Sequence, residues 1–444
     1  MRRREEQLPL SPAWIDHAHA RELEKISQIL DENSELAALI QQDLLRGVKN
    51  PHRGRAGMSG DQLLRVLVLK QMNGFSYEDL DFHLMDSASY RTFCRIGAMD
   101  PSPSRSAIAE NVKKLRWRTL EKLNRVVVEY ARQQGVEDGS KVRVDSTVME
   151  AHIHHPSDSA VLYDGVRVLA RLLGRVEKLS GFRSWRDHTR LAKRRMIKIH
   201  RTRKDGVRLK AYRDLLKAVL KTLGYARAGL DVVRRKRGKA TRLRKKLAEV
   251  ITLVDRVRDQ TERRVLRGEK VETEERIVSI FEPHTDVLVK DHKNIYYGHK
   301  LTLTGGASGM LLDCVVESGN PNDATRAVTM VKRQKKIYGQ APQQAAMDGT
   351  YASRDNLREI KKLGTKQVCF SAPRGMSAEE MAGSRPVYRR LRDFRAGIEG
   401  VISFVKRCFG LRRCTWRGEP SFKSYAWSSV VSANLLILAR HLLR

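Results

Sequence analysis

Between residues 141 and 406 the chain alternates β-like and helical patterns, and this alternation limits the possible folds more than any other feature. The first β-like run, 141–147, alternates charged and β-branched residues with the period of two that a half-buried strand requires. Strands that alternate with helices predict an α/β core. The later runs are strands at 295–304, 310–317, 344–347 and 367–371, with helices at 322–336 and 353–363.

A glycine-rich segment, Gly305–Gly309, joins two of these expected strands. A Gly-rich phosphate-binding loop would be followed by Lys-Ser or Lys-Thr and by the start of a helix. Neither feature follows Gly309. We therefore expect a hairpin turn here.

Two β-like runs end on an aspartate. Asp145 ends the first run, and Asp348 stands between an apolar run and Gly349, as at the end of a strand that enters a turn. Taken singly, an Asp at such a position is more typical of a turn or a cap than of a catalytic site. The pair becomes informative because a third carboxylate, Glu399, follows in a helical pattern.

The helical pattern around Glu399 sets this carboxylate between two cations. With 3.6 residues per turn, Arg395, Glu399 and Lys406 line up beside an apolar stripe, so the acid is expected at the edge of a core. An Arg four residues before a Glu is also an ordinary surface pair, and this interpretation would suffice if the helix stood alone. The stripe consists of Ile398, Val401, Ile402, Val405 and Phe409.

These motifs resemble the DDE transposases of bacterial insertion sequences, in the branch whose third acid lies in a Tyr-x2-Arg-x3-Glu-x6-Lys signature. Arg395, Glu399 and Lys406 match the Arg, Glu and Lys of the signature, whereas Arg392 occupies its Tyr position. The role of that Tyr is therefore unassigned here. Three further segments are similar to strand motifs of these enzymes: Asp145–Thr147, Tyr297–Leu301 and Asp348–Ser353.

The resemblance implies a ribonuclease H-like catalytic core. From the residues themselves we expect a helical N-terminal domain and a helical basic insertion in addition to this core. We expect Asp145 on the first strand of that core. The expected division is a helical domain at 1–135, the first core strand at 136–160, the insertion at 161–280, and the remaining core with C-terminal helices at 281–444.

Three acids of this kind suit phosphodiester chemistry with divalent metal. Two ions about 3.5–4 Å apart can activate the attacking oxygen and stabilise the leaving oxygen. Mg²⁺ prefers a few carboxylates plus substrate phosphate, and Mn²⁺ could substitute. Asp145 and Asp348 are the candidate catalytic metal ligands, with Asp145 bridging, and Glu399 would complete the set. Arg395 and Lys406 would bind DNA phosphates, or neutralise Glu399 when DNA is absent.

Histidines 152, 154 and 155 follow the first acid and suggest a metal site of another kind. Neutral imidazole favours zinc-like metals, and the carboxylates explain the expected site without it. We leave these histidines out of the predicted site.

Composition agrees with a nucleic-acid partner. The 444 residues include 86 Lys and Arg against 51 Asp and Glu, a formal net charge of +35. Such an excess favours phosphate binding through release of counterions. We expect a transposase that binds terminal inverted repeats and target DNA, cleaves strands and joins the 3′-hydroxyl. The alternatives are a metal-dependent nuclease of the same fold and a non-enzymatic basic DNA-binding protein.

The first third of the chain is expected to be helical. Ser59 and Gln62 have the spacing of a capping box, Gly74 follows the apolar run, and Ser76 caps a second short helix. This order suits a helix-turn-helix-like bundle that would read DNA ends or dimerise. A bundle with only a structural role is equally compatible with the pattern.

The insertion is the most basic part of the chain. Two clusters, 190–204 and 234–239, flank a run in which Leu216, Val219, Leu220 and Leu223 recur at helical spacing. The pattern predicts an antiparallel helical arm whose basic face grips DNA or crosses to a partner subunit. The alternative is a solvated helical hairpin whose charges keep it soluble.

Compartment and assembly are predicted from indirect signs. Arg2–Arg4 are followed by Glu5–Gln7 rather than by an apolar segment, so no secretory signal is expected. The apolar stretch 425–439 contains Ser and Asn and is short for a membrane span, so we expect a buried closing helix and no membrane association. Five cysteines without a CxxC pair suggest reduced thiols.

We expect a cytoplasmic protein, nucleoid-associated when bound to DNA, that acts as a homodimer because two element ends must be processed.

Overall fold

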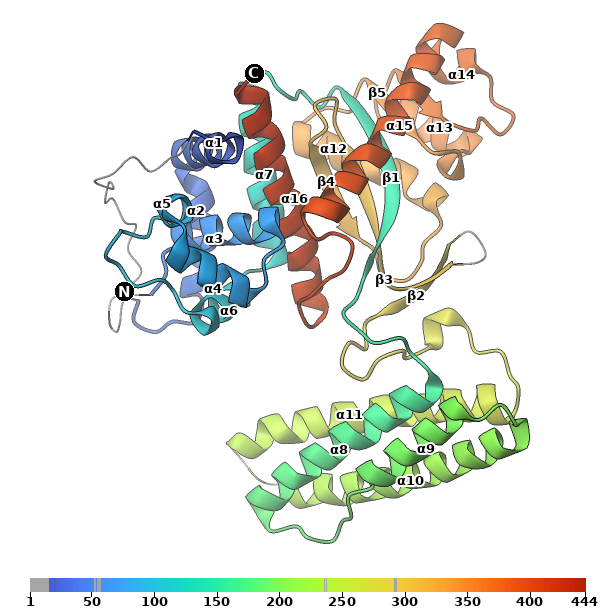
Figure 1. Cartoon of the computed structure of the whole chain (residues 1–444). Helices are drawn as coiled ribbons and strands as arrows, with labels where there is room; N and C mark the ends of the chain where they lie inside the picture. Colours follow the sequence, from blue (N-terminus) through green and yellow to red (C-terminus); the bar gives the residue numbers. More distant parts are fainter. Residues whose placement is uncertain (1–15, 52, 54–56, 235, 237, 291–293) are drawn as a thin grey trace. The chain divides into compact units, whose positions relative to one another are not determined.

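The computed structural model describes residues 16–51, 53, 57–234, 236, 238–290 and 294–444. The chain divides into two compact units, Met1–Glu150 with Lys300–Arg444, and Ala151–His299 (Figure 1). The segment Arg2–Gln7 and two members of the second basic cluster, Arg235 and Arg237, lie outside the described residues. A sheet combined with many helices confirms the predicted mixed α/β class.

Before the first strand, the described residues form helices whose starts and ends follow the sequence signals. Ser59 and Gln62 form a capping box at the start of α3, and Gly74 ends this helix with a φ of 65°. A second capping box, Ser76 with Asp79, starts α4. Both predicted caps are therefore confirmed. The helices are α1 (Ala18–Glu32), α2 (Ser34–Leu45), α3 (Gly60–Asn73), α4 (Tyr77–Asp86), α5 (Ala88–Phe93), α6 (Arg105–Val112) and α7 (Trp117–Gln133).

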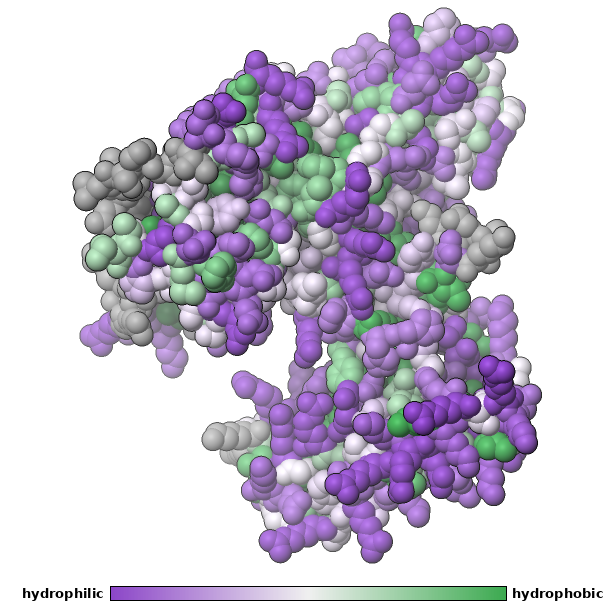
Figure 2. Space-filling model, viewed as in Figure 1, coloured by the Kyte–Doolittle hydropathy of each residue, from purple (hydrophilic) through white to green (hydrophobic). Residues whose placement is uncertain are grey.

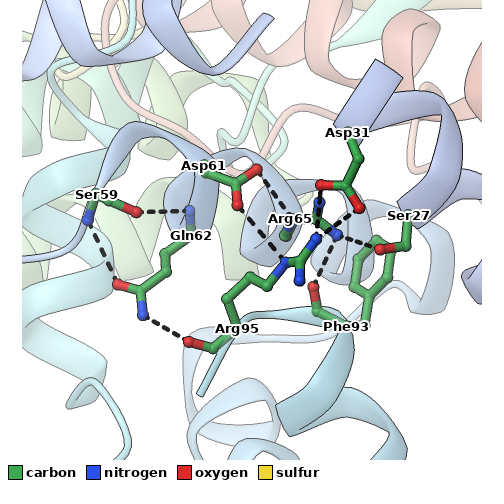
Figure 3. A network of polar contacts seen from close by, with 8 residues as sticks. All are labelled: Ser27, Asp31, Ser59, Asp61, Gln62, Arg65, Phe93 and Arg95. Carbon is green, nitrogen blue, oxygen red and sulfur yellow. Dashed lines mark hydrogen bonds and ion pairs between the residues drawn. The ribbon is translucent and has the colours of Figure 1, made fainter. Parts of the chain in front are cut away.

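A fully buried arginine holds α3 to α1 and α5 (Figure 3). The Arg65 guanidinium lies 3.0 Å from Asp61 and 2.8 Å from Asp31, and it also donates to Ser27 Oγ and to the Phe93 carbonyl. Arg95 forms a second ion pair with Asp31. The planar fork of Arg satisfies several acceptors at once, which an ammonium group on one flexible stem does less well. This network therefore fixes the relative placement of three helices.

The described strands form one six-stranded sheet in the order β2-β3-β1-β5-β6, with β4 also paired to β3. β1 (Lys141–Glu150) is parallel to β5 (Gln344–Met347), which is parallel to β6 (Gln367–Phe370). β3 (Asn294–Gly305) is antiparallel to both β2 (Asp286–Lys290) and β4 (Leu311–Val316). The predicted strands and the hairpin turn at Gly305–Gly309 are confirmed. The boundary between the two units falls within β3, after His299.

Helices cover the strands of the first unit (Figure 1). α15 (Arg385–Cys408) packs on β1, β5 and β6, while α7 and α16 (Glu419–Leu442) pack on each other and on β4. The other helices of this part are α12 (Ala327–Tyr338), α13 (Arg354–Lys362) and α14 (Ala378–Ala382).

The closing helix α16 is buried along most of its length, as predicted. Most of its buried polar side chains form hydrogen bonds inside the protein, whereas Ser432 Oγ forms none with the described residues. Asn434 accepts a hydrogen bond from the Leu311 amide at 2.8 Å and donates to Asn124 Oδ1 at 2.8 Å, and Gln71 donates to Ser428 Oγ at 2.5 Å. These bonds explain how an apolar helix tolerates buried Ser and Asn. Among the residues that the structure describes, no helix is long and apolar enough to span a membrane.

The second unit is built mainly from four long helices, α8 (Asp158–Ser180), α9 (Thr189–Arg201), α10 (Asp205–Val233) and α11 (Lys239–Thr261). Their shared core contains Leu216, Val219 and Leu223 of α10, which the helical spacing predicted to be apolar contacts. Leu220 of the same run is instead 42% exposed. The apolar spacing therefore predicted helix α10 correctly, but it included one exposed residue, Leu220, among the buried ones.

The Arg65 network predicts a large loss of stability when the guanidinium is removed. Arg65→Met leaves Asp61 buried without its closest cation, and we expect the free energy of unfolding to fall by about 3 kcal/mol. Denaturant unfolding followed by circular dichroism measures this change. The matched control is Arg105→Met, which breaks a largely exposed pair with Glu78 and should change stability by less than about 0.5 kcal/mol. Equal effects of the two substitutions would contradict the role given to Arg65.

Candidate active site

Two acids meet because β1 and β5 are parallel neighbours in register. Val144 is paired with Met347, so Asp145 and Asp348 occupy the next position on adjacent strands. Neighbouring strands lie about 4.8 Å apart, which brings side chains at matching positions close together. Asp348 is the first residue after β5 and precedes a short 3₁₀ turn at Gly349–Tyr351. The prediction of a strand end is confirmed at Asp348 but is wrong at Asp145, because β1 continues to Glu150 and Asp145 lies in its middle. The two carboxylates meet through the register of the strands.

Helix α15 brings the third acid to the same point. Ile398, Ile402 and Val405 are buried beneath the helix, as the apolar stripe predicted. Phe409, just past the helix end, is also buried, whereas Val401 is half-buried. Glu399 lies next to this buried face, on the solvent side of the helix, and its side chain is 65% exposed.

A single guanidinium joins all three acids. Arg395 Nη2 lies 3.2 Å from Asp145 Oδ2 and 3.4 Å from Asp348 Oδ1, while Nη1 lies 2.8 Å from Glu399 Oε1. The Arg395 side chain is only 16% exposed. The sequence predicted the pair with Glu399, but the contacts with the two aspartates arise only from the fold. Three segments far apart in the sequence therefore converge on one cation.

The environment of Asp348 favours its ionised form. Partial burial raises the pKa of this carboxyl, but hydrogen bonds from Ser371 Oγ and the Gly349 amide, together with the charge of Arg395, outweigh burial and lower the pKa overall. The bond from Ser371 is 2.7 Å long. Ser371 follows β6, so the next strand of the sheet supports the acid. Sequence reasoning did not identify this serine.

Tyr351 is a buried side chain close enough to Asp145 for the charge of this acid to act on its hydroxyl. Its side chain is fully buried, and burial raises the pKa of its hydroxyl, with further contributions from the charges of Asp323 and Asp145. Asp323 is held in turn by Lys300, whose ammonium lies 2.6 Å from Asp323 Oδ1 and donates to the Pro321 carbonyl at 2.8 Å. Lys300 belongs to the Tyr297–Leu301 motif, and this one member of the motif holds Asp323, whose charge acts on Tyr351.

The position of α15 over the sheet depends on a close approach at Gly397. Arg143 of β1 donates a 2.9 Å hydrogen bond to the Phe394 carbonyl, and its guanidinium lies 4.6 Å from the centre of the Phe394 ring. Lys141 lies 4.3 Å from the same ring. A Cβ atom at Gly397 would overlap Arg143 Nη1. The absence of a side chain at this position lets the helix lie close enough to present Arg395 and Glu399.

The remaining signature positions lie along the same helix. Lys406 follows Glu399 by seven residues, about two turns, and is half-buried on the same side of α15. Arg392, at the Tyr position of the signature, is exposed. Tyr388, one turn earlier, donates its hydroxyl to the Phe370 carbonyl at 2.8 Å. This tyrosine anchors α15 to the end of β6, a role that sequence reasoning did not assign.

The carboxylate oxygens of the three acids are of the type that binds a hard divalent cation. Carboxylate oxygens are the ligands that Mg²⁺ prefers, and three negative charges surround one positive group. Their spacing is set by the guanidinium between them, and no group of three His, Cys, Asp or Glu side chains in the described ranges is arranged to hold a metal ion directly. The carboxylates could therefore hold metal if Arg395 moved from between them.

Two family models match the chain. One, Transposase domain (DUF772), matches residues 13–114, and the other, Transposase DDE domain, matches residues 284–435. The chain belongs to the DDE transposases of insertion sequences. Asp348 and Glu399 of this transposase lie within the second match, and Asp145 lies outside both. No curated protein and no solved structure matches the chain.

The close approach at Gly397 predicts that a side chain at this position displaces the Arg143 guanidinium and costs stability. Gly397→Ala should displace Arg143 and lower the free energy of unfolding of the transposase by about 1–3 kcal/mol, the cost of overfilling a packed contact. Gly400→Ala, on the same helix with open space around it, is the control and should stabilise by up to about 1 kcal/mol. Denaturant unfolding compares the two. A neutral Gly397→Ala would mean that Arg143 does not fix the helix.

The hydrogen bond from Ser371 predicts a measurable change in acidity at Asp348. Because the folded-state pKa is lowered, the stability that Asp348 contributes is present above about pH 4 and is lost as the pH falls further. Ser371→Ala should raise the pKa of Asp348, measured by NMR of labelled carboxyl carbons. Ser384→Ala, which removes a hydroxyl that makes no cap hydrogen bond, should leave the pKa unchanged. An unchanged pKa in both variants would show that the hydroxyl has no such effect.

Proposed function

We propose that the protein binds the ends of its insertion sequence, hydrolyses DNA strands and joins the freed 3′-hydroxyl to target DNA. The convergence of Asp145, Asp348 and Glu399 on Arg395 supports this proposal most directly. Metal-dependent phosphodiester cleavage uses several carboxylate ligands close to one another, whereas a purely DNA-binding protein would gain nothing from placing them together on a strongly basic chain. The matches to transposase families agree with this chemistry.

The fold that we propose for this core is ribonuclease H-like. The three antiparallel-paired strands β2, β3 and β4 and the parallel strands β1, β5 and β6 share one sheet. Along the chain, β1 comes first, the β3–β4 hairpin follows, and α12, β5, α13 and β6 complete the order. This order agrees with what the resemblance implied, with Asp145 on the first strand.

The metal ligands that we propose are the three acids. Asp145 and Asp348 would hold Mg²⁺, and Glu399 would complete the set. When bound, the ions supply charge stabilisation for the attacking and leaving oxygens, and Mn²⁺ would serve as well. The hydrogen bond from Ser371 lowers the pKa of Asp348 and so favours the ionised form that a metal ligand needs. Arg395 and Lys406 would hold DNA phosphates, so Arg395 exchanges its carboxylates for a phosphate as DNA enters.

The parts outside the acids would carry recognition and assembly. We propose a helical N-terminal domain over residues 1–135 that binds element ends or dimerises, core segments at 136–160 and 281–444, and the basic insertion between them. Two ends must be processed together, so the active form would be a homodimer on double-stranded DNA.

A cleavage and joining assay tests the function. The substrate is the DNA that flanks the gene, with a second duplex as target, and the enzyme is wild type in Mg²⁺ or in EDTA. Asp145→Asn, Asp348→Asn and Glu399→Gln should each lower product formation by at least about 100-fold, because each removes a ligand charge from the reacting centre. Asp393→Asn is the control, since this exposed acid lies on the same helix and should leave the rate within about twofold.

The pattern of products separates the possible functions. Nicked and joined products that both require Mg²⁺ and all three acids support a transposase. Cleavage without joining would indicate a nuclease of the same fold. Binding without cleavage in any metal would favour a non-enzymatic DNA-binding protein, and activity that survives the acid substitutions would place the chemistry elsewhere.

A further inference from the structure

The positive charge of the chain is concentrated in one segment of the second unit. Residues 151–250 contain 29 Lys and Arg against eight Asp and Glu, which accounts for +21 of the net charge of +35. The rest of that unit, 251–299, contains nine basic and ten acidic residues. Figure 2 shows mostly hydrophilic side chains over the visible face of this unit. A surface that only promotes solubility usually mixes both signs, so this separation calls for another explanation.

Helix α9 is the most extreme element of the segment. Six of its thirteen residues are Lys or Arg, and none is Asp or Glu. At about 100° per residue, five of the six fall within an arc of about 140°, opposite the buried Ala192 and Ile199. All five are exposed. They form the α9 basic face: Arg190, Lys193, Arg194, Lys198 and Arg201.

The α9 basic face is not neutralised by the described part of the protein. None of its five cations lies within ion-pair distance of a described carboxylate. The sixth cation, Arg195, points to the side and pairs with Asp214 at 3.3 Å. Other arginines of the unit are also paired, as Arg167 is with Asp164 at 2.8 Å and Arg208 with Asp205 at 2.7 Å. The unit therefore contains carboxylates that pair with arginines, but they lie away from this face.

Such a face weakens its own helix. Arg190 and Arg194, and then Arg194 and Lys198, are like charges four residues apart, an arrangement that destabilises a helix. A ligand with several negative charges at regular spacing would relieve this repulsion. From Arg190 to Arg201 the helix rises about 16 Å, and one DNA strand carries a phosphate about every 3.4 Å along the duplex axis. The face is long enough to meet several phosphates.

The composition of the face argues against other partners. Binding to a membrane surface uses exposed apolar side chains beside the cations, and protein interfaces are centred on aromatic and apolar residues. None of the large hydrophobic residues that are exposed in the described structure belongs to α9, and the helix contains no Phe, Tyr or Trp.

We propose that the α9 basic face binds the phosphate backbone of double-stranded DNA without reading its sequence. This inference rests on the proposed function, because the DNA on which the transposase acts supplies the polyanion. It assigns to the insertion a binding surface separate from the three acids and from the phosphate contacts of Arg395 and Lys406. Backbone contacts of this kind supply affinity and position, whereas base contacts supply specificity.

The test compares two triple variants of the full chain that lose the same charge. One is Arg190→Gln, Arg194→Gln and Lys198→Gln on the α9 basic face. The control is Arg167→Gln, Arg208→Gln and Arg227→Gln, which removes three ion-paired arginines from the same unit. Circular dichroism confirms that both variants are folded. Fluorescence anisotropy then measures binding to a duplex of scrambled sequence in EDTA over a range of NaCl concentrations.

For the α9 variant we expect the slope of log affinity against log salt to become shallower by about 2–3, since each lost phosphate contact contributes about 0.9. The control should change the slope by less than about 1. The loss should be equal on duplexes that carry the element ends. Equal slopes for the two variants would overturn the proposal, and a loss limited to one sequence would overturn backbone binding in favour of base recognition.

The cleavage assay keeps this proposal distinct from the proposed function. The α9 variant should still form products in Mg²⁺ when the DNA concentration is raised, because its acids are intact. Asp145→Asn should bind the scrambled duplex with the wild-type salt slope and yet form no product at any DNA concentration. If cleavage is normal and the α9 variant binds like its control, the transposase function stands and the α9 proposal fails. If wild type binds no DNA at all, both fail.

Discussion

The parallel register of β1 and β5 is the constraint on which the candidate active site depends. It places Asp145 beside Asp348, although about 200 residues of sequence separate them. Two carboxylates at neighbouring positions repel each other unless a cation lies between them. Arg395 supplies that cation and at the same time draws in Glu399 from its own helix. The pairing of β1 with β5, the position of α15 and the balance of charge around Arg395 therefore depend on one another.

The basic residues of this chain serve different physical purposes. Arg65 is fully buried and organises the N-terminal helices through several acceptors, and Arg143 holds α15 to the sheet through the Phe394 carbonyl and ring. Arg395 balances the acids. On the α9 basic face, by contrast, the five cations face outward, beyond ion-pair distance of the described carboxylates. Net charge alone does not distinguish these uses, because each depends on which carboxylates, carbonyls and rings the fold brings near.

Local patterns predicted much of this structure. Period-two alternation marked β1, capping boxes marked the starts of α3 and α4, and the glycine-rich turn marked the β3–β4 hairpin. The stripe beside Glu399 predicted the buried side of α15, with Val401 only half-buried. These features depend on residues near one another in sequence. The contacts of Arg395 with the aspartates, the bond from Ser371 and the close approach at Gly397 depend on strand register and helix docking, which no local period encodes. A helical period also could not show that Leu220 is exposed, because the width of a buried face is decided by its neighbours.

The second unit is inserted between β1 and the rest of the sheet, so the three acids come together only late in the synthesis of the chain. Asp145 is made early, but Asp348 and the helix that carries Arg395 and Glu399 emerge from the ribosome much later. The intervening unit is a bundle of long helices with mostly local contacts, a type of structure that folds quickly and on its own. The first strand must therefore wait for its parallel neighbour until most of the chain has been translated. Incomplete products of translation therefore contain the basic helices of the second unit but no assembled set of acids.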